Sequence, residues 1–388
     1  MGYSINVLAP SSPVELAEAL RDAAAAGRTI ALAGGSTKRH MAGPVEPADV
    51  TVTTMSLRGV LQYEPRDLTI SVCAGVSWRE LTHLLADHRQ MVPLDPPFAH
   101  DATVGGVISA NCSGPRRRLY GTARDVVIGM TFATLEGKLV KSGGMVVKNV
   151  AGLDMAKLMI GSFGTLAAIA VVNFKVQPMP EVERSFLLPF DSLAAAIAAR
   201  NAILKGQLQP AAIDLLNPAA AQTLGHSTWL LALRAGGNQA AVQRYEGEFA
   251  HFAGAQAFED KDQQTLWRHV ENSTPRFLAA HEDGAVVRAS CTLKDSEAVM
   301  ASFPGPAVAR AGSGVCYGYF ERAQGAADWL SGAQRSAWKA VIEFAPEGSR
   351  RTFDLWPSPG ADFEIMQRVK HLFDPRNLLN RGRLYRLI

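Results

Sequence analysis

Three glycine-rich segments carry residue types that could bind an extended anion. The first, residues 33–40 (AGGSTKRH), directly follows an apolar run typical of a buried strand. Its glycines, Gly34 and Gly35, would let successive backbone N–H groups converge on one anion, and the hydroxyls of Ser36 and Thr37 would add donors. A diphosphate would suit such a loop, but the same residues suit an ordinary surface turn equally well.

The other two segments are longer. Residues 101–118 (DATVGGVISANCSGPRRR) contain small residues that leave the backbone bare on one side, as a flat ring or a sugar phosphate would require. Residues 143–152 (GGMVVKNVAG) run on towards residues 160–165 (IGSFGT). Three such segments fit a long nucleotide better than a small substrate, with turns alone as the alternative reading. No Rossmann fingerprint, P-loop, nucleophile elbow or HExxH motif occurs in the chain.

Composition excludes several classes of protein. Forty-seven per cent hydrophobic and 19% charged residues are globular values, and 388 residues suit two domains. The formal charge of +3 is spread along the chain, so we expect no nucleic-acid partner. The longest aliphatic run, residues 166–172, is far shorter than the ~20 residues of a membrane helix, so no transmembrane segment is expected. Four cysteines without CxxC or zinc spacing predict buried thiols, and the lack of a signal pattern predicts a cytoplasmic protein.

Apolar periodicity predicts two regions of mixed helix and strand. Capping boxes at Ser12–Glu15 and Ser77–Glu80 predict two helices among strands at residues 29–33, 50–54 and 68–74. From residue 185 the predicted order is β-α-β-β-α-β, the ferredoxin-like layout, up to a short strand near residue 257. Beyond it we predict helices at residues 263–271, 332–343 and 362–373 and strands at residues 285–291 and 315–320. We find no internal sequence repeat.

Four motifs resemble one flavoprotein family. They are PLDPP at residues 93–97, TVGGVISANCSGPRRRLYG from residue 103, VKNVAGLDMAKLMIGSFGTL from residue 147, and FDPRNLLNRGRLY from residue 373. They are similar to the vanillyl-alcohol-oxidase family of PCMH-type FAD-binding proteins, and within it to FAD-binding subunits of bacterial glycolate oxidases. The resemblance implies an α+β protein in three parts: a two-subdomain FAD-binding domain over residues 1–180, a cap domain with the ferredoxin-like layout over residues 181–350, and a C-terminal helix and tail over residues 351–388 that pack back on the FAD domain.

The resemblance also implies which residues bind FAD. They are Gly34, Gly35, Ser36, Thr37 and Lys38 at the pyrophosphate, Pro96, Thr103, Gly105, Gly106, Ser113 and Gly114 along the ribityl chain and ring, Ile169 at the adenine side, and Asn380 at the flavin rim. Covalent members attach flavin to a histidine nearer the two glycines than His40, so we expect non-covalent FAD. Two positions depart from the family pattern: Leu153 replaces a tyrosine, and Arg381 replaces a proline in the tail.

Catalytic residues are harder to assign. Oxidising a 2-hydroxy acid needs a base for the hydroxyl proton and a cation for the carboxylate. Catalytic subunits of the family carry a histidine-rich segment that binds metal and supplies the base, and this chain lacks it. The candidates that remain are Arg288 and Lys294 for a carboxylate and His281 for a base, each also consistent with an ordinary surface position. Residues 116–118 (RRR) could neutralise an anion or form a solvated turn, and no metal site is expected.

Two functions therefore stay open. The chain could be the FAD-carrying subunit of a glycolate oxidase, with a catalytic flavoprotein subunit and an iron–sulfur subunit as partners and a possible place at the inner membrane through that complex. Alternatively it could be a self-sufficient FAD-dependent dehydrogenase of glycolate or D-lactate. The missing histidine-rich segment favours the first function, and its four scattered cysteines could not ligate a cluster themselves. A scaffold without cofactor is disfavoured by the three glycine-rich segments.

Overall fold

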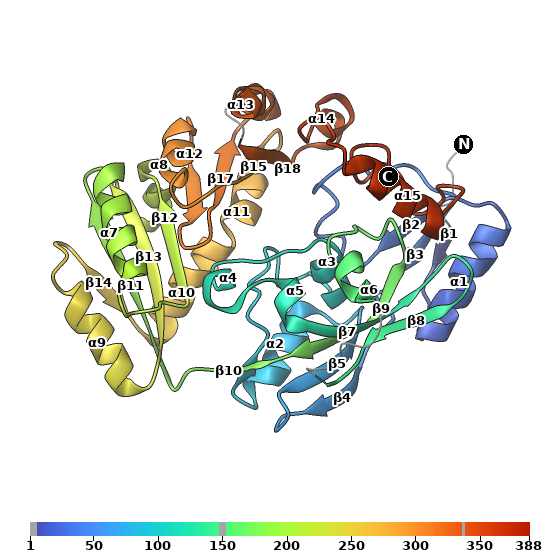
Figure 1. The fold of residues 1–388 in the computed structure, drawn as a ribbon, viewed down its shortest axis with the longest axis horizontal. Helices are drawn as coiled ribbons and strands as arrows, with labels where there is room; N and C mark the ends of the chain where they lie inside the picture. The colour runs from blue at the N-terminus through green and yellow to red at the C-terminus, as the bar shows by residue number, and fades with distance from the viewer. Residues whose placement is uncertain (1–5, 147–152, 336–337) are drawn as a thin grey trace. The chain divides into compact units, whose positions relative to one another are not determined.

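The computed structural model describes residues 6–146, 153–335 and 338–388 (Figure 1). Contacts divide the chain into two units. Unit 1 comprises Met1–Cys112, Thr122–Met179 and Ser358–Ile388, and unit 2 comprises Ser113–Gly121 and Pro180–Pro357. This division differs from the expected boundaries because residues 113–121 group with unit 2 and the final segment begins at residue 358. In the described ranges, no helix is both long and apolar enough to cross a membrane.

Unit 1 begins with a small parallel sheet in the order β1 (Asn6–Leu8), β3 (Val50–Thr53), β2 (Ile30–Ala33). Helix α1 (Pro13–Ala25) starts where predicted, because the Ser12 hydroxyl accepts a hydrogen bond from the Glu15 N–H at 3.1 Å. The Glu15 carboxylate accepts a hydrogen bond from the N–H of Ser11, whereas in a standard capping box it would accept from the N–H of the cap residue, Ser12. Buried Leu16 and Leu20 lie on one face of this helix, as the apolar spacing predicted.

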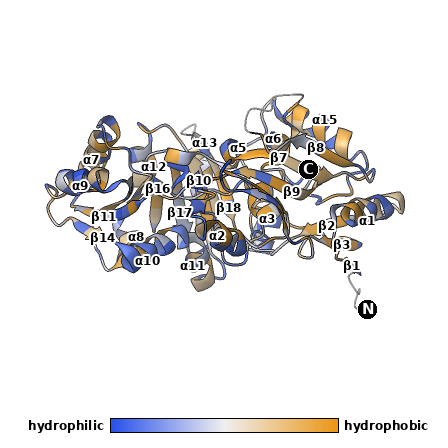
Figure 2. Cartoon of the chain, turned by 90° about the horizontal axis from the view of Figure 1, so that it is seen from below, coloured by the Kyte–Doolittle hydropathy of each residue, from blue (hydrophilic) through white to orange (hydrophobic). Residues whose placement is uncertain are grey.

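A second, antiparallel sheet completes the body of unit 1. Its order is β4 (Val60–Glu64), β5 (Thr69–Cys73), β9 (Ala168–Lys175), β7 (Val127–Ala133), β8 (Leu139–Gly143). The central strands β7 and β9 are largely apolar along their length (Figure 2). Helices α2 (Trp78–Ala86), α3 (Val104–Ser109), α5 (Ala123–Val126) and α6 (Met155–Met159) belong to the same unit, and β6 (Gln90–Met91) pairs with β10 (Gln177–Pro178).

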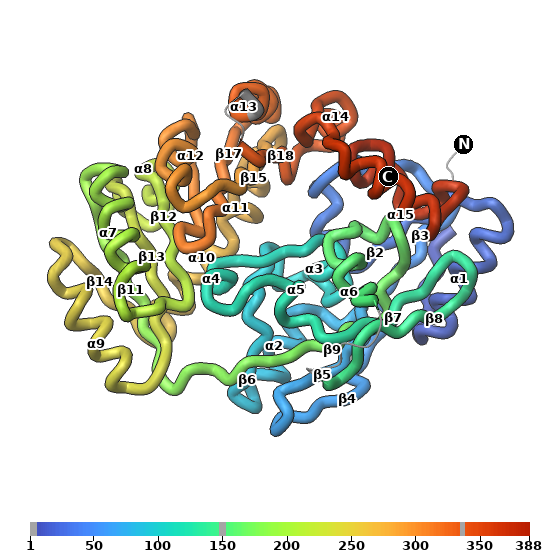
Figure 3. Tube along the Cα trace, viewed as in Figure 1, coloured from blue at the N-terminus to red at the C-terminus, as the bar shows by residue number. Residues whose placement is uncertain are grey.

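The C-terminal segment packs back on unit 1, as expected. After α15 (Phe363–Phe373) the tail lies beside β2, where Leu379 forms a parallel bridge with Ile30 (Figure 3). Buried Lys370 fixes the turn between helix and tail: its Nζ donates to the Thr165 carbonyl (2.8 Å), the Asp374 carboxylate (2.7 Å) and the Leu379 carbonyl (3.0 Å). The C-terminal tail is therefore part of unit 1, together with the N-terminal residues of the chain.

The first half of unit 2 has the predicted ferredoxin-like layout. Its elements are β11 (Val182–Phe190), α7 (Leu193–Lys205), β12 (Ala212–Leu216), β13 (Trp229–Gly237), α9 (Gln239–Phe249) and β14 (Gln256–Phe258). The strands lie antiparallel in the order β14-β11-β13-β12, which is the order of that fold. Helices α8 (Pro218–Ala221), α10 (Asp260–Glu271) and α11 (Ser273–Ala280) complete this half.

The second half of unit 2 has the same fold as the first half, although we find no sequence repeat between them. The elements β15 (Ala285–Ser290), α12 (Ser296–Ser302), β16 (Ala307–Arg310), β17 (Val315–Phe320), α13 (Ala323–Arg335) and β18 (Lys339–Phe344) follow the same β-α-β-β-α-β order. Their strand order, β18-β15-β17-β16, matches the first half, and β12 pairs antiparallel with β16 to make one eight-stranded sheet. The second strands of the two halves thus form the seam. Helix α14 (Glu347–Thr352) follows β18.

Two predictions in this half were wrong. The helix expected at residues 332–343 ends as α13 at Arg335, and the remainder forms β18, with Trp338 just before the strand. Ala340 and Ile342 are buried in alternation with less buried neighbours, which is a strand period. Likewise only three cysteines are buried, because Cys291 is partly accessible.

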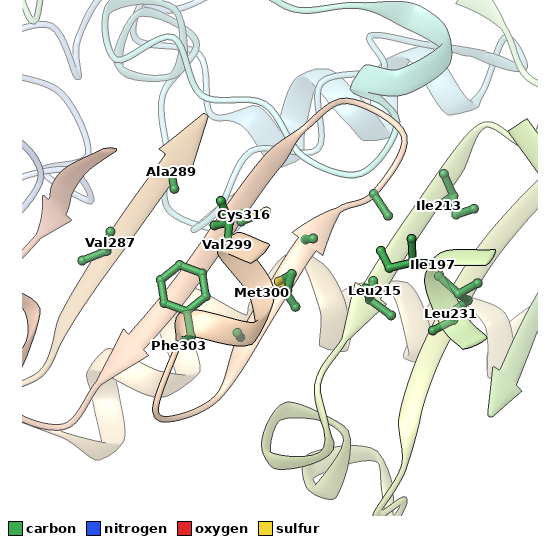
Figure 4. Packing of buried hydrophobic residues seen from close by; sticks show 14 of the residues in the cluster. Ile197, Ile213, Leu215, Leu231, Val287, Ala289, Val299, Met300, Phe303 and Cys316 are labelled. Carbon is green, nitrogen blue, oxygen red and sulfur yellow. The ribbon is translucent and has the colours of Figure 1, made fainter. Parts of the chain in front are cut away.

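The sheet of unit 2 has one apolar and one polar face. Alternate strand residues such as Ile213, Leu231, Val287 and Cys316 join residues of α7, α9, α12 and α13 in one buried cluster (Figure 4). The intervening residues point the other way, since successive side chains of a strand alternate. That second face carries arginines, tyrosines and carboxylates on its strands, and it is the polar region described below.

Candidate functional site

The loop after β2 has the geometry of an anion-binding nest. Backbone N–H groups of Gly35, Ser36, Thr37 and Lys38 donate to no other described residue, so they are available to an outside acceptor. Ser36 has φ of 53°, the left-handed conformation that turns neighbouring N–H groups towards one point. The glycines are needed because a Cβ on Gly34 would lie 2.4 Å from Thr103 Oγ1. A Cβ on Gly35 would lie 2.0 Å from the Asp101 carbonyl oxygen.

Lys38 adds a buried cation to this loop. Its side chain is only 9% exposed, and Nζ donates to the Pro97 carbonyl (2.8 Å) and the Thr37 hydroxyl (3.1 Å), both neutral. Burial lowers the pKa of Lys38, because removing the ammonium from water costs free energy and its hydrogen-bond partners carry no charge to offset that cost. An anion held by the N–H groups would offset that cost. The loop therefore fits the diphosphate of FAD.

The predicted ring-lining residues of unit 1 lie around the start of α3. Thr103 caps this helix, since its hydroxyl accepts from the Gly106 N–H at 3.2 Å. Gly105 allows close packing of α3 against Ala74. Its N–H donates to the Ala74 carbonyl, and a Cβ at this position would lie 2.9 Å from the Ala74 Cβ. Pro96 is buried just before the turn that leads into this segment. Contact of these residues with a flavin ring stays a prediction.

Asn380 is a structural link between three segments of unit 1. Its Oδ1 accepts from the Leu32 N–H, and its Nδ2 donates to the Phe163 carbonyl, each at 2.7 Å. The amide is thus used within the protein, and its role at the flavin rim stays a prediction. Ile169 is buried in β9, where it pairs with Phe132 of β7.

Sequence reasoning missed Arg383, which supports the loop from the tail. Its guanidinium donates to the Lys38 carbonyl (3.1 Å) and the Gly43 carbonyl (2.8 Å), and it lies over the Phe163 ring. Arg381, the departure from the family pattern, donates to the Pro47 carbonyl at 2.7 Å. The tail therefore holds the carbonyl side of the nest, while the N–H side is left open.

The remaining predicted cofactor residues fall elsewhere. Ser113 and Gly114 belong to unit 2, and Ser113 Oγ accepts from Arg117 at 3.2 Å. Residues 147–152 of the third glycine-rich segment lie outside the described residues. Its last part is described: Gly164 has φ of 70°, and a Cβ there would lie 2.8 Å from Asn380 Nδ2.

The polar face of unit 2 gathers charged groups from several strands. Arg288 of β15 donates to the Glu343 carboxylate of β18 at 2.9 Å and to Ser290 Oγ at 3.1 Å. Tyr317 pairs with Arg288 in register, and Arg310 lies over the Tyr317 ring. Arg310 also forms a buried ion pair with Asp214 across the seam of the two halves.

Arg117 joins this cluster from residues 113–121. Burial lowers the pKa of Arg117, and Tyr317, Arg288, Arg310 and Glu343 are all close enough for their charges to act on it. We call Arg117, Arg288, Arg310, Asp214, Glu343 and Tyr317 the arginine face. Its three guanidinium groups exceed its two carboxylates by one positive charge, so it suits a monoanion such as a carboxylate.

Burial also sets the protonation of the acids on this face. Burial raises the pKa of Glu343, and the charges of Arg288, Arg310 and Arg117 oppose that rise. Burial likewise raises the pKa of the Tyr317 phenol well above its ordinary value. Among the groups of the arginine face, Glu343 is therefore the one whose pKa shifts towards neutral pH.

Of the three sequence candidates for catalysis, only Arg288 lies on the arginine face. Lys294 is exposed in the turn before α12. His281 follows α11, stacks on Phe277 at 4.3 Å and places Nδ1 3.0 Å from the Phe277 carbonyl oxygen. Asp214, Arg310, Tyr317 and Glu343 were missed. The signal that could have found them is a charged residue or tyrosine within an otherwise apolar strand. Within the described ranges no cluster of histidine, cysteine and acidic residues could hold a metal ion.

Two family models match most of the chain. Residues 5–143 match the model of the FAD binding domain, and residues 179–293 and 358–384 match the C-terminal domain of FAD linked oxidases. Over 186 residues the chain is 34% identical to the glycolate oxidase subunit GlcE of Escherichia coli, covering 48% of this chain and 51% of that protein. It is 30% identical to the Bacillus subtilis glycolate oxidase subunit GlcD over 158 residues, covering 41% and 34%.

Other relatives are D-lactate dehydrogenases, such as the mitochondrial cytochrome-type enzyme 1 of Saccharomyces cerevisiae, 29% identical over 48% of this chain and 32% of that enzyme. The chain thus spans about a third to a half of the length of these curated relatives. Solved structures share the fold: alkyldihydroxyacetonephosphate synthase (TM-score 0.70, 17% identity, 96% of this chain and 75% of that one) and 4-ethylphenol oxidase from Gulosibacter chungangensis (TM-score 0.72, 14% identity, 97% and 88%).

Proposed function

Because this chain belongs to the PCMH-type FAD-linked oxidases, we propose that it is a flavoprotein acting on the CH–OH group of small 2-hydroxy acids, as a subunit of a glycolate oxidase complex. The single observation that carries the substrate class is the surplus positive charge of the arginine face, which suits one carboxylate. The similarity to glycolate oxidase subunits and D-lactate dehydrogenases supports the same class.

The nest would hold FAD without a covalent bond. The N–H groups of residues 35–38 and the ammonium of Lys38 would bind the diphosphate, because the N–H groups donate to no described residue and the ammonium contacts only neutral oxygens. Arg383 would keep the nest in shape by holding the Lys38 carbonyl. FAD, when bound, supplies the acceptor for the hydrogen and two electrons removed from the alcohol carbon.

On the arginine face, Arg288 and Arg117 would bind the substrate carboxylate. Arg310 is paired with Asp214, so its guanidinium stays in place and attracts the substrate carboxylate only through its charge. If the chain oxidises its substrate by itself, Glu343 would accept the hydroxyl proton, because burial raises its pKa and a base works best when its pKa lies near the working pH. Arg288 and Glu343 lie on one face of the sheet, where the pairing of β15 with β18 brings them together.

The proposed partners are a catalytic flavoprotein subunit and an iron–sulfur subunit. The sequence lacks the histidine-rich segment of catalytic subunits, and the similarity to GlcE supports a subunit role. A second candidate, a self-sufficient dehydrogenase of glycolate or D-lactate, is favoured by one observation: Glu343 beside Arg288 offers a base that the sequence alone did not reveal.

Anaerobic flavin reduction separates these functions. The purified chain should be yellow and release FAD on denaturation. Glycolate or D-lactate should bleach its flavin absorption slowly alone and fast only after the partner subunits are added. Fast bleaching of the lone chain would establish the self-sufficient dehydrogenase instead, and a colourless chain that takes up no FAD would refute both.

Substitution of Arg288 tests the carboxylate site. Arg288→Met should raise the dissociation constant of the 2-hydroxy acid by about 10- to 100-fold, because a hydrogen bond to a charged group contributes roughly 1.5–3 kcal/mol. Lys294→Met is the matched control, a basic residue exposed in the turn after the same strand. Equal affinities of the two variants would place the carboxylate elsewhere.

A further inference from the structure

Two cysteines of unit 2, one in β17 and one directly after β15, pack in the buried cluster on the helix-covered face of the sheet. Cys316 belongs to β17 and is fully buried, while Cys291 directly follows β15 and is partly accessible. In the register Ala289 pairs with Cys316, and the Cys291 N–H donates to the Gly314 carbonyl at 2.8 Å. The two side chains are therefore diagonal neighbours on one face, and Figure 4 shows Cys316 among the core residues there.

The two thiols differ in how readily they ionise. The hydrogen bond between them lowers the pKa of Cys291. The same bond, together with burial, raises the pKa of Cys316 well above its usual value. The thiol that ionises more readily is thus the one that a reagent in solution can reach. Its Sγ also lies 3.5 Å from the Gly314 carbonyl oxygen.

Arg200 of α7 places a buried positive charge beside this pair. Its residue is only 1% exposed, and its guanidinium donates to Ser296 Oγ (2.9 Å), the Ala311 carbonyl (3.2 Å) and the Leu293 carbonyl (3.0 Å), all neutral. Its buried Nε has no hydrogen-bond partner among the described residues.

Three charged groups act around the pair. Arg200 lowers the pKa of both thiols. Asp295 opposes it at Cys291, and Glu297 interacts with Arg200 itself. A cation that no carboxylate contacts directly would favour a thiolate at Cys291, the reactive form of cysteine.

We propose that Cys291 and Cys316 are a reversible redox dithiol that is oxidised by low-molecular-weight disulfides. The Cys291 thiolate attacks one sulfur of the disulfide, forms a mixed disulfide and releases one small thiolate. The Cys316 thiol then loses its proton, attacks Cys291 Sγ and releases the second small thiolate. Two protein thiols are thus oxidised to one disulfide while the reagent is reduced to two thiols. This assignment does not depend on the proposed function.

Thiol counting on the full chain tests the proposal. The protein is equilibrated in glutathione buffers of decreasing reduced fraction, quenched with acid, denatured and labelled with a maleimide, and its mass is measured. Four free thiols should fall to two, peptide mapping should find the Cys291–Cys316 bond, and dithiothreitol should restore all four. Four thiols under oxidising conditions, or a bond between another pair, would overturn the assignment.

Single variants separate the two roles. Cys316→Ser should accumulate a stable glutathione adduct on Cys291, because no thiol remains to release it, whereas Cys291→Ser should keep its three thiols. Cys73→Ala, which removes a buried cysteine of unit 1, should still lose two thiols. A wild-type protein that carries a persistent glutathione adduct on Cys291 would show that Cys316 does not act as the second thiol.

Arg200 provides a rate measurement. Arg200→Gln should form the first adduct at least about tenfold more slowly than wild type, while Arg200→Lys keeps the charge and should stay close to the wild-type rate. Equal rates for the two folded variants would refute the role of the buried charge.

Discussion

The two candidate sites of this molecule are built from different materials. The nest in unit 1 uses the backbone N–H groups of residues 35–38, which are consecutive in the chain. The arginine face of unit 2 uses side chains from β12, β15, β16, β17 and β18 and from residues 113–121. One site therefore depends on the shape of a short loop, and the other on the register of a whole sheet.

This difference determines how each site can fail. A loop of N–H groups loses function when a side chain is added, because added atoms change its path. A set of paired charges loses stability when a side chain is removed, because the partner is left buried without compensation.

The largest effect is expected from breaking the buried pair at the seam of unit 2. Asp214→Asn leaves the Arg310 guanidinium without its carboxylate and should lower the free energy of unfolding of unit 2 by about 3–5 kcal/mol. Urea unfolding followed by tryptophan fluorescence measures this, because five of the six tryptophans lie in unit 2. Glu248→Gln, which removes a carboxylate from the exposed pair with Arg244, is the control and should change little. Equal unfolding midpoints would contradict the contrast.

The loop should respond to an added side chain. Gly35→Val places a Cβ 2.0 Å from the Asp101 carbonyl oxygen and should weaken FAD binding at least tenfold, about 1.4 kcal/mol or more. The ratio of flavin to protein after desalting measures retention, and circular dichroism checks the fold. Gly247→Ala in α9, where a Cβ meets nothing within 4 Å, is the matched control. Full flavin retention in Gly35→Val would place the diphosphate elsewhere.

Support from the tail should matter less than the loop itself. Arg383→Met removes the donors to the Lys38 and Gly43 carbonyls and should weaken FAD binding by about 3- to 10-fold, through loss of loop order. Arg381→Met is the neighbouring control, since its guanidinium donates to the exposed Pro47 carbonyl and not to the loop of residues 35–38. Fluorescence titration with FAD compares them, and a larger loss in Arg381→Met would reverse the proposed roles.

At pH 7 the smallest effect is that of His269 on the polar side of unit 2, and this effect grows as the pH falls. Burial, with the nearby Arg276, lowers the pKa of His269 to about 4, so this histidine is neutral in the folded protein at pH 7. The unfolded chain takes up a proton near pH 6.5, so stability should fall as the pH drops from about 6.5 towards 4. His269→Gln should flatten that fall in thermal unfolding curves, and exposed His251→Gln should not. Identical curves would show that His269 does not contribute.

The sequence by itself determined the features that depend on neighbours in the chain. The glycines and hydroxyls of residues 34–37 specified a tight loop after a strand, and the Ser12 and Ser77 caps fixed two helix starts. The residues of the run 315–320 predicted β17 at its observed limits. The ferredoxin-like order of residues 182–258 also followed from local periodicity, and motif resemblance supplied the family.

Tertiary structure alone decided which distant residues meet. Pairing of β12 with β16 brings Asp214 to Arg310, and pairing of β15 with β17 and β18 brings Arg288 to Tyr317 and Glu343. Nothing near Arg310 in the chain announces these partners, which lie up to 96 residues away. Helix α13 and strand β18 were misread for the same reason, because burial against other strands overrides local helix propensity. Side-chain clusters require the register of the sheet, whereas a backbone nest requires only its own few residues.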